Sequence, residues 1–236
     1  MLTNGVTPYP ELLELAIAKN IPLFGSNLET TKISYLIADF LDDIFANKLS
    51  VHASLVDVYG VGMMFVGKSG VGKSEVALDL VERGHRLVAD DVVILTKKGE
   101  GILMAAGTEL GGHFMEIRGI GIIDVRSMFG VRAVRYQKRL EVVIELEVWQ
   151  QDEEYTRTGL DDSTIPILDV KIPYVRLPII PGKNVTVVAE VIALNYLLKH
   201  YGYDAAKVLT NKIKEKMEKT SDLDNTNINY FEHDFE

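Results

Sequence analysis

The chain has 236 residues, 47% of them hydrophobic, which is enough for one sizeable core or for a main domain with a small appendage. Its formal net charge of -9 favours a soluble, cytoplasmic protein and argues against a nucleic-acid partner, which would require a basic stripe. The lack of cysteine excludes disulfides, thiolate nucleophiles and cysteine-ligated zinc, and no apolar run predicts a membrane span or a secretion signal.

The first 45 residues predict two helices with a short strand between them. Pro10 begins a short amphipathic helix, because proline is favoured in the first turn, and residues 21–24 predict the strand. Thr30 and Thr31 cap a second helix that continues to about Phe45, with apolar residues at helical spacing. We expect these apolar positions to have a structural role.

The stretch from 67 to 74 is the most informative part of the chain. It matches the phosphate-binding pattern G-x-x-x-x-G-K-S/T at every fixed position. An apolar run at 63–66 precedes it and a helix-forming run at 75–83 follows, which makes a chance match in a glycine-rich loop the weaker interpretation. The predicted nucleotide-binding residues are Gly67, Lys68, Ser69, Gly70, Val71, Gly72, Lys73 and Ser74.

The chemistry of this loop follows from its glycines and from the helix behind it. Glycines let the backbone curl so that successive N–H groups point inward and surround an anion. The helix that begins near Lys73 adds unpaired N–H groups and the positive end of its dipole. We expect Lys73 to reach the β- and γ-phosphates of ATP, and the Ser74 hydroxyl to bind Mg²⁺.

Two adjacent carboxylates follow the helix. Asp90 and Asp91 come at the end of the apolar strand 87–89, and in phosphate-loop proteins a neighbouring strand ends in an acid that serves the metal. Strand alternation directs the two side chains to opposite sides, so one could serve the metal while the other reaches the reacting oxygen. A turn with solvated carboxylates is the alternative.

Three further side chains are weaker candidates. His52 lies early in the first of two strands predicted over 50–66, joined at residues 59–60, and a lone histidine in a strand is usually structural. Glu116 and Arg118 alternate with apolar residues between glycines, which directs both charges to one face of an extended segment. A carboxylate and a guanidinium side by side suit a metal and a phosphate, and a surface ion pair is the alternative.

The rest of the chain predicts a mixed sheet with flanking helices rather than a regular parallel doubly wound pattern. We expect a hairpin within 87–105, one helical turn at 125–129, and a half-exposed strand at 140–148 with its glutamates solvated. Residues 151–163 predict a loop, 165–180 strand, and 181–184 a turn. Apolar helix 185–201 ends at Gly202, and Asp204 caps a last helix to about Lys219.

Taken together, these stretches resemble the bifunctional HPr kinase/phosphorylase family of bacteria over about residues 21–199. The resemblance rests on the runs 67–75, 83–91 and 114–123, together with His52, 157–161 and 170–173. It implies an α/β phosphate-loop kinase domain like that of phosphoenolpyruvate carboxykinase, and a homohexamer. It also implies ATP- and Mg²⁺-dependent phosphorylation of one serine of HPr, a carrier protein of the sugar phosphotransferase system. The reverse activity is phosphorolysis, in which inorganic phosphate releases pyrophosphate from phosphoserine.

The resemblance also implies roles for individual residues. Asp91 is the base that takes the serine proton, and the acid that returns it in the reverse reaction. Ser74 and Glu116 bind Mg²⁺, and Asp90 assists at the metal. The other active-site positions that match are His52, Lys73 and Arg157.

The chain departs from the family's usual pattern in three places. Lys68 replaces the usual aspartate in the loop, and Ile180 and Lys183 replace two arginines of a Pro-Val-Arg-Pro-Gly-Arg segment tied to dephosphorylation. The usual N-terminal domain is reduced to a remnant at 1–45, before a catalytic domain at 46–219 and a flexible acidic tail at 220–236. The alternatives are a kinase for another protein or a small metabolite, and an ATP sensor without transfer.

Overall fold

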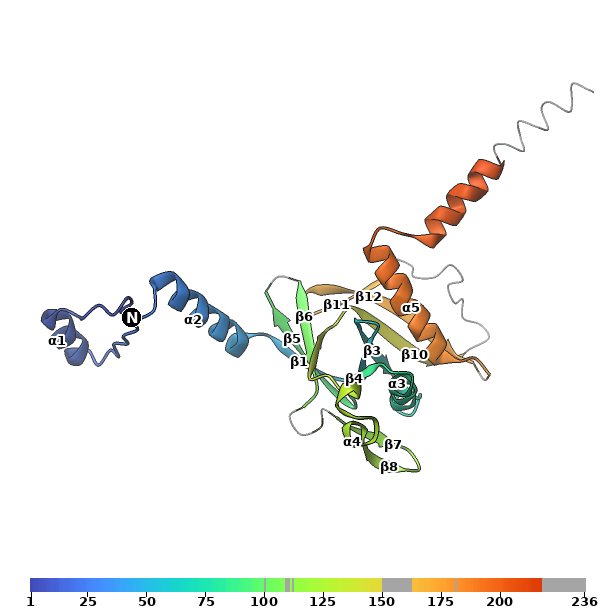
Figure 1. Ribbon diagram of the computed structural model, residues 1–236, viewed down its shortest axis with the longest axis horizontal. Coiled ribbons are helices and arrows are strands. Elements are labelled where there is room, and N and C mark those ends of the chain that lie inside the picture. The colour runs from blue at the N-terminus through green and yellow to red at the C-terminus, as the bar shows by residue number, and fades with distance from the viewer. Residues whose placement is uncertain (100, 109–110, 112, 150–162, 181, 218–236) are drawn as a thin grey trace, which may run out of the picture.

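The protein is a mixed α/β fold, described by a computed structural model for residues 1–99, 101–108, 111, 113–149, 163–180 and 182–217 (Figure 1). Its centre is a six-stranded sheet in the order β11-β12-β10-β3-β2-β4, in which β10 runs parallel to both β3 and β12 and the other pairs are antiparallel. The mixed sheet is therefore confirmed. The bounds are β2 (Ser54–Val58), β3 (Val61–Gly67), β4 (Arg86–Ala89), β10 (Val142–Val148), β11 (Thr164–Ile167) and β12 (Val170–Ile179).

A second sheet packs against the first, and the chain passes between the two sheets three times, after β1, after β4 and after β9. The second sheet has the order β1-β5-β6-β9. Its strands are β1 (Lys48–His52), β5 (Val92–Lys98), β6 (Ile102–Ala106) and β9 (Gln137–Arg139). The single strand expected before Tyr59 divides at Ala53, because β1 pairs with β5 whereas β2 pairs with β3 and β4. The next crossing is at Asp90–Asp91, and the Ala53 N–H donates to the Asp91 carbonyl at 3.2 Å, so the two crossings lie side by side.

The six-stranded sheet has a hydrophobic core on each face. One core joins it to the helices α3 (Lys73–Glu82) and α5 (Val185–His200), with Phe65, Leu80 and Ala189 fully buried. The other fills the space between the two sheets, around Leu55, Met64 and Leu103. Since both faces are covered, the central strands are long apolar runs in the sequence.

The glutamates of β10, expected on a solvated face, are half-buried and have side-chain partners. Glu145 accepts a hydrogen bond from the Tyr174 hydroxyl, and burial together with this carboxylate raises the pKa of Tyr174 to about 12. Glu147 holds Arg176 with two hydrogen bonds of 2.8 Å each. Alternation along the strand predicts which residues share a face, but it does not reveal that side chains of the neighbouring strand β12 bind the glutamates on that face.

The turns and short elements near the phosphate loop largely follow the expectations. The hairpin of β7 (Phe114–Ile117) and β8 (Gly121–Asp124) leads into α4 (Val125–Phe129), the predicted helical turn, and a short 3-10 helix, η1 (Val131–Ala133). Met115 and Ile117 are buried against the first core, while Glu116 between them is exposed. The hairpin therefore lies beside α3, with its charged face directed away from this core.

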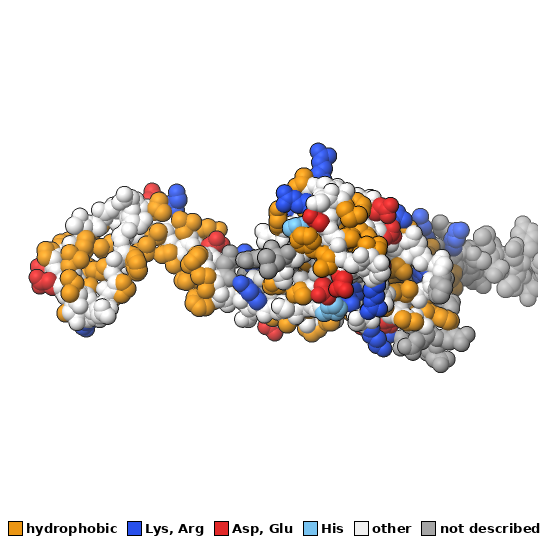
Figure 2. Space-filling view, turned by 90° about the horizontal axis from the view of Figure 1, so that it is seen from below, with side chains coloured by type: hydrophobic (Ala, Val, Ile, Leu, Met, Phe, Trp, Pro, Cys, Tyr) orange, Lys and Arg blue, Asp and Glu red, His pale blue; other side chains and the backbone are white. Residues whose placement is uncertain are grey.

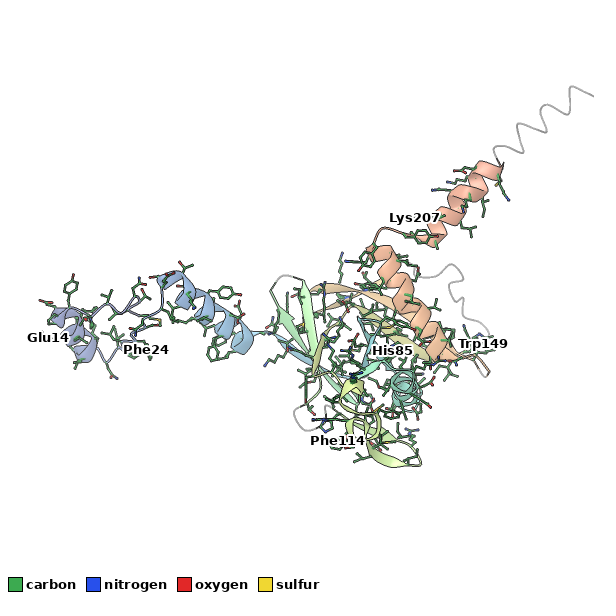
Figure 3. The ribbon with its side chains drawn as sticks, in the orientation of Figure 1. Glu14, Phe24, His85, Phe114, Trp149 and Lys207 are labelled. Carbon is green, nitrogen blue, oxygen red and sulfur yellow. The ribbon has the colours of Figure 1, made fainter. Side chains whose placement is uncertain are left out.

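His85 ties the end of α3 to α5 in the interior of the domain (Figure 3). It is buried, and its Nε2 lies 3.1 Å from Oε1 of Glu190 on α5. The ring of Tyr59 packs edge-on against it, with centroids 4.7 Å apart. Arg83, at the end of α3, lies 3.5 Å from the other oxygen of Glu190. These contacts fix the helix that follows the phosphate loop.

The N-terminal residues extend away from the two sheets (Figure 1). They form α1 (Pro10–Ala18), begun by Pro10 as expected, and α2 (Thr30–Phe45), whose cap is Glu29 without a side-chain hydrogen bond rather than a threonine. The strand expected at 21–24 is absent from this described segment, where Gly25 forms only an isolated bridge with Leu2. Many hydrophobic side chains lie on this part of the molecule in Figure 2. Phe40 of α2 is exposed.

The last described helix covers residues 205–217, and Asp204 caps it by accepting from the N–H groups of Ala206 and Lys207, as expected. Residues 220–236, expected to be a tail, lie outside the described residues, and the proposed division into domains stays a prediction. No helix in the described part of the chain is long and apolar enough to cross a membrane.

Asn184 provides a test of the packing of α5. Its side-chain oxygen accepts from the N–H of Val187 at 3.1 Å and caps the helix. We expect Asn184→Ala to lower the free energy of unfolding by about 1 kcal/mol, because a helix N–H loses its partner. Denaturant unfolding measures this loss. Asn184→Ser should keep most of the stability, and an alanine variant as stable as the parent would contradict the role of the cap.

Candidate active site

A cavity of about 190 Å³ lies where the phosphate loop, the two strand crossings and the β7–β8 hairpin meet. Most of the side chains predicted from the sequence line it. They are Ser69, Gly70, Gly72, Lys73 and Ser74 of the loop and helix, His52, Asp90 and Asp91 of the crossings, and Glu116 of the hairpin. Arg157 lies outside the described residues.

The loop conformation requires its glycines. Gly67, Gly70 and Gly72 have φ angles of 142°, 77° and 105°, which side chains rarely tolerate. A Cβ atom at Gly67 would also lie 2.5 Å from the carbonyl oxygen of Leu146 on β10. The strand, the curled loop and the helix that begins at Lys73 thus form the anion-binding arrangement that the sequence predicts.

Lys73 is buried beneath the loop. Its Nζ donates to the main-chain oxygens of Gly67, at 3.2 Å, and Lys68, at 3.4 Å. These contacts hold the ammonium group inside the curve of the loop. A cation at this position neutralises the charge of an anion bound by the surrounding N–H groups.

Asp90 is the buried carboxylate of the site. It accepts hydrogen bonds from the Ser74 hydroxyl at 2.9 Å and from the Ser54 hydroxyl at 2.5 Å. Burial raises the pKa of Asp90, and the two serine hydroxyls oppose that shift. Ser54 was not predicted from the sequence, because nothing distinguishes it from any polar residue at the start of an apolar strand.

Asp91 is the exposed carboxylate, and His52 contacts it across the two crossings. The Nδ1 atom of His52 lies 2.8 Å from Oδ1 of Asp91 and 3.0 Å from its main-chain oxygen. Asp91 has a φ angle of 65°, a conformation that aspartate and asparagine tolerate better than most residues. This turn directs the two adjacent carboxylates to different places. Asp90 points to Ser54 and Ser74, and Asp91 reaches the open side of the cavity.

The charged face of the hairpin closes the remaining side. Glu116 and Arg118 both line the cavity, and within the described residues no ion pair joins them to each other. Arg118 lies close to the loop, since a Cβ atom at Gly70 would be 2.5 Å from its Nη1. The cavity therefore holds two cationic groups, Lys73 and Arg118, above a set of oxygen ligands.

These oxygen ligands are of the kind that Mg²⁺ binds. The described residues contain no group of three or more His, Cys, Asp or Glu side chains able to hold a metal. Mg²⁺ does not require such a group, because it binds through one or two carboxylates, waters and the phosphates of the substrate. Ser74, Asp90 and Glu116 fit this mode, whereas they would not form a cage for a metal without a phosphate.

The two residues that depart from the family's usual pattern after β12 are Ile180 and Lys183. Ile180 follows the strand, and Lys183 lies in a shallow hollow before α5 together with Glu75 and Asp79 of α3. Glu75 lines the main cavity as well.

Asp90 gives a prediction for the stability of the ligand-free protein. The folded-state pKa of Asp90 is raised above the usual value, so the charged carboxylate destabilises the folded protein at a pH above that folded-state pKa. This destabilisation is absent at a pH below the unfolded-state pKa of about 4, where the group is protonated in both states. Asp90→Asn should therefore raise the thermal midpoint at pH 7 and leave it unchanged below about pH 4. Thermal unfolding across this range measures the effect. An asparagine variant that is less stable at pH 7 would show that the two serine hydrogen bonds outweigh the burial of charge.

Comparisons with known proteins agree with this geometry. The family described as "HPr Serine kinase C-terminal domain" matches residues 43–213. The HPr kinase/phosphorylase of Chloroherpeton thalassium is 57% identical over 100% of this chain and 70% of its own length, and that of Prosthecochloris aestuarii is 55% identical over 91% and 63%. This chain thus spans about two thirds of the length of these curated relatives.

A solved structure also matches. It is the structure of the Hpr(Ser) kinase/phosphatase from Coxiella burnetii, with a TM-score of 0.60 and 32% identity, covering 68% of this chain and 98% of that one. The fold, the matched domain and the identity to curated relatives agree with the resemblance found in the sequence. The chain belongs to the HPr kinase/phosphorylase family.

Proposed function

We propose that this chain is an ATP- and Mg²⁺-dependent protein serine kinase that phosphorylates HPr in the cytoplasm. The observation that carries the proposal is the position of the exposed carboxylate of Asp91, held by His52, in the same cavity as the phosphate loop. A phosphate-binding protein that only senses ATP needs no such carboxylate. The exposed apolar side chains of α2, such as Phe40, support assembly with further copies, for which we propose the homohexamer.

Binding of the triphosphate falls to the loop. Its N–H groups and the start of α3 surround the β- and γ-phosphates, and Lys73 neutralises part of their charge. Ser74, Asp90 and Glu116 would hold Mg²⁺, which offsets the charge of the phosphates when it is bound. Arg118, beside Gly70, is placed to pair with the transferred phosphoryl group.

Asp91 then acts on the substrate serine. It takes the proton of the serine hydroxyl as the serine oxygen attacks the γ-phosphorus, and the bond from this phosphorus to the β,γ-bridging oxygen breaks to release ADP. His52, with a proton on Nδ1, donates to the Asp91 carboxylate and keeps it aimed at the cavity. In the reverse direction, a phosphate oxygen attacks the phosphoserine phosphorus, and the bond from this phosphorus to the serine oxygen breaks. The protonated Asp91 carboxyl gives its proton to the serine oxygen, and pyrophosphate leaves.

We expect the reverse activity to be weak in this chain. Ile180 cannot bind phosphate, and Lys183 replaces a bidentate guanidinium with a point charge. The double substitution Ile180→Arg and Lys183→Arg should raise pyrophosphate release from phosphoserine-HPr by about tenfold, the gain expected from one charged hydrogen bond. The kinase rate serves as the control and should change little. Rapid pyrophosphate release by the unsubstituted chain at saturating phosphate would contradict this expectation.

A coupled assay for ADP tests the proposed function. The chain is supplied with Mg²⁺ and ATP, together with HPr, with HPr whose target serine is replaced by alanine, with small hydroxyl-bearing metabolites, or with no acceptor. ADP release that depends on HPr and on its serine supports a serine kinase for this partner. Release only with small acceptors would identify a metabolite kinase. Tight binding of ATP with no ADP release under any condition would identify a sensor.

A further inference from the structure

Three consecutive residues at the crossing from β1 to β2 hold the two aspartates at the crossing from β4 to β5. The Nδ1 atom of His52 lies 2.8 Å from Oδ1 of Asp91, and the Ala53 N–H donates to the Asp91 main-chain oxygen at 3.2 Å. The Ser54 hydroxyl donates to Oδ1 of Asp90 at 2.5 Å. The proposed reaction gives His52 and both aspartates a role, but it gives none to Ser54.

The hydroxyl of Ser54 is buried at a place where the sheet itself needs no polar group. Ser54 begins β2, a strand that is buried along its whole length, and its own exposed fraction is 0%. The next two residues, Leu55 and Val56, are fully buried as well. A hydroxyl taken out of water costs free energy unless it finds a hydrogen-bond partner, and here that partner is the carboxylate of Asp90. An apolar residue would serve the strand equally well, so the hydroxyl serves Asp90.

Asp90 is held from two sides by hydroxyl groups. Ser54 donates to Oδ1, and the Ser74 hydroxyl lies 2.9 Å from Oδ2 and 3.1 Å from Oδ1. Because Ser54 belongs to the sheet and Ser74 to the first turn of α3, Asp90 connects the helix behind the phosphate loop to the strand crossing. With its proton donated to Asp90, the Ser74 oxygen keeps its lone pairs for a cation in the cavity that it lines. The direction of the Ser74 hydroxyl therefore depends on where the Asp90 carboxylate is fixed.

We propose that Ser54 is a positioning residue of the metal site: its hydroxyl fixes the Asp90 carboxylate, and Asp90 in turn directs the lone pairs of Ser74 into the cavity. The proposal rests on the proposed function, in which Ser74, Asp90 and Glu116 hold Mg²⁺. Hydrogen-bond partners that orient the ligands of a metal are worth about 10- to 100-fold in metal affinity. Removal of the Ser54 hydroxyl should therefore weaken binding that depends on Mg²⁺ and spare binding that does not.

Calorimetry with ADP, measured once with Mg²⁺ and once with a chelator in place of the metal, tests the proposal. The parent chain should bind Mg²⁺-ADP more tightly than metal-free ADP. Ser54→Ala should weaken the binding of Mg²⁺-ADP by about tenfold and leave the binding of metal-free ADP unchanged. Ser54→Thr retains a hydroxyl and should bind both forms of ADP as the parent does.

Ser127→Ala is the matched control for Ser54→Ala. Ser127 also donates its hydroxyl to an aspartate, Asp124, at 2.6 Å, but this pair lies in α4 outside the cavity. The Ser127→Ala variant should bind both forms of ADP as tightly as the parent does.

The other outcomes decide against the proposal. A Ser54→Ala variant that binds Mg²⁺-ADP as tightly as the parent would overturn it. Equal weakening of both forms of ADP would overturn it as well, because Ser54 would then support the loop rather than the metal. If the added methyl group of Ser54→Thr does not fit the buried position and binding is lost, the alanine variant decides alone.

The binding measurements also separate this proposal from the proposed function. A parent chain that binds ADP equally with and without Mg²⁺ would contradict the metal site, and the role of Ser54 with it. The calorimetry needs no HPr, so a chain that fails to phosphorylate HPr still gives a result for Ser54.

Discussion

Asp91→Asn is expected to reduce phosphotransfer from ATP to HPr by about a thousandfold, the usual contribution of a positioned general base. Asparagine has nearly the same shape and tolerates the left-handed backbone at this position, where φ is 65°. It cannot accept the serine proton. Binding of ATP should change little, because the lost charge is on the side chain that faces the acceptor. Initial rates with labelled ATP, together with a separate binding measurement, make this distinction.

Asp169→Asn is the matched control for this variant. Asp169 has a φ angle of 64° and is exposed in the turn between β11 and β12, away from the cavity. The Asp169→Asn variant should keep the phosphotransfer rate of the parent chain. If Asp91→Asn also keeps the parent rate, Asp91 is not the base. If the Asp91→Asn variant loses ATP binding together with activity, Asp91 serves the nucleotide rather than the acceptor.

Lys73→Met is expected to reduce phosphotransfer by about a hundredfold or more, because a preorganised charge aimed at the transferring phosphates is lost. Methionine retains the apolar stem of the lysine beneath the loop. The variant should also bind Mg²⁺-tripolyphosphate more weakly, which calorimetry measures. This second readout separates the lost charge from a change at the acceptor.

Lys48→Met, the same substitution at an exposed position of β1, is the control and should bind and react as the parent does. A Lys73→Met variant that folds and still binds tripolyphosphate like the parent would contradict the role of Lys73. It would place the phosphates outside the curve of the loop.

Local sequence patterns predicted the phosphate loop well. Its glycines, the apolar strand before it and the helix after it are neighbours in the sequence, so strand, loop and helix could all be inferred. The Asp90–Asp91 pair was found for the same reason, as the end of an apolar run beside the loop. Proline at the first turn of α1 and aspartate before the helix at 205–217 are local signals of the same kind.

The features that the sequence did not reveal depend on contacts between distant segments. The division of one apparent strand into β1 and β2 follows from pairing with β5 in one sheet and β3 in the other. The same crossing brings Ser54 to Asp90, 36 positions later in the chain. Glu145 and Glu147 alternate with apolar residues as a solvated face would, yet Tyr174 and Arg176 of β12 cover them. The spacing of apolar residues along one segment does not predict such contacts between distant segments.

The most direct measurement of the central claim is the transfer of the γ-phosphate of labelled ATP to purified HPr by this chain, with and without Mg²⁺. The account predicts label on one serine of HPr, dependence on Mg²⁺, and loss of the label when that serine is replaced by alanine. Label on HPr at another residue, or none on HPr while the chain binds ATP tightly, would contradict the account.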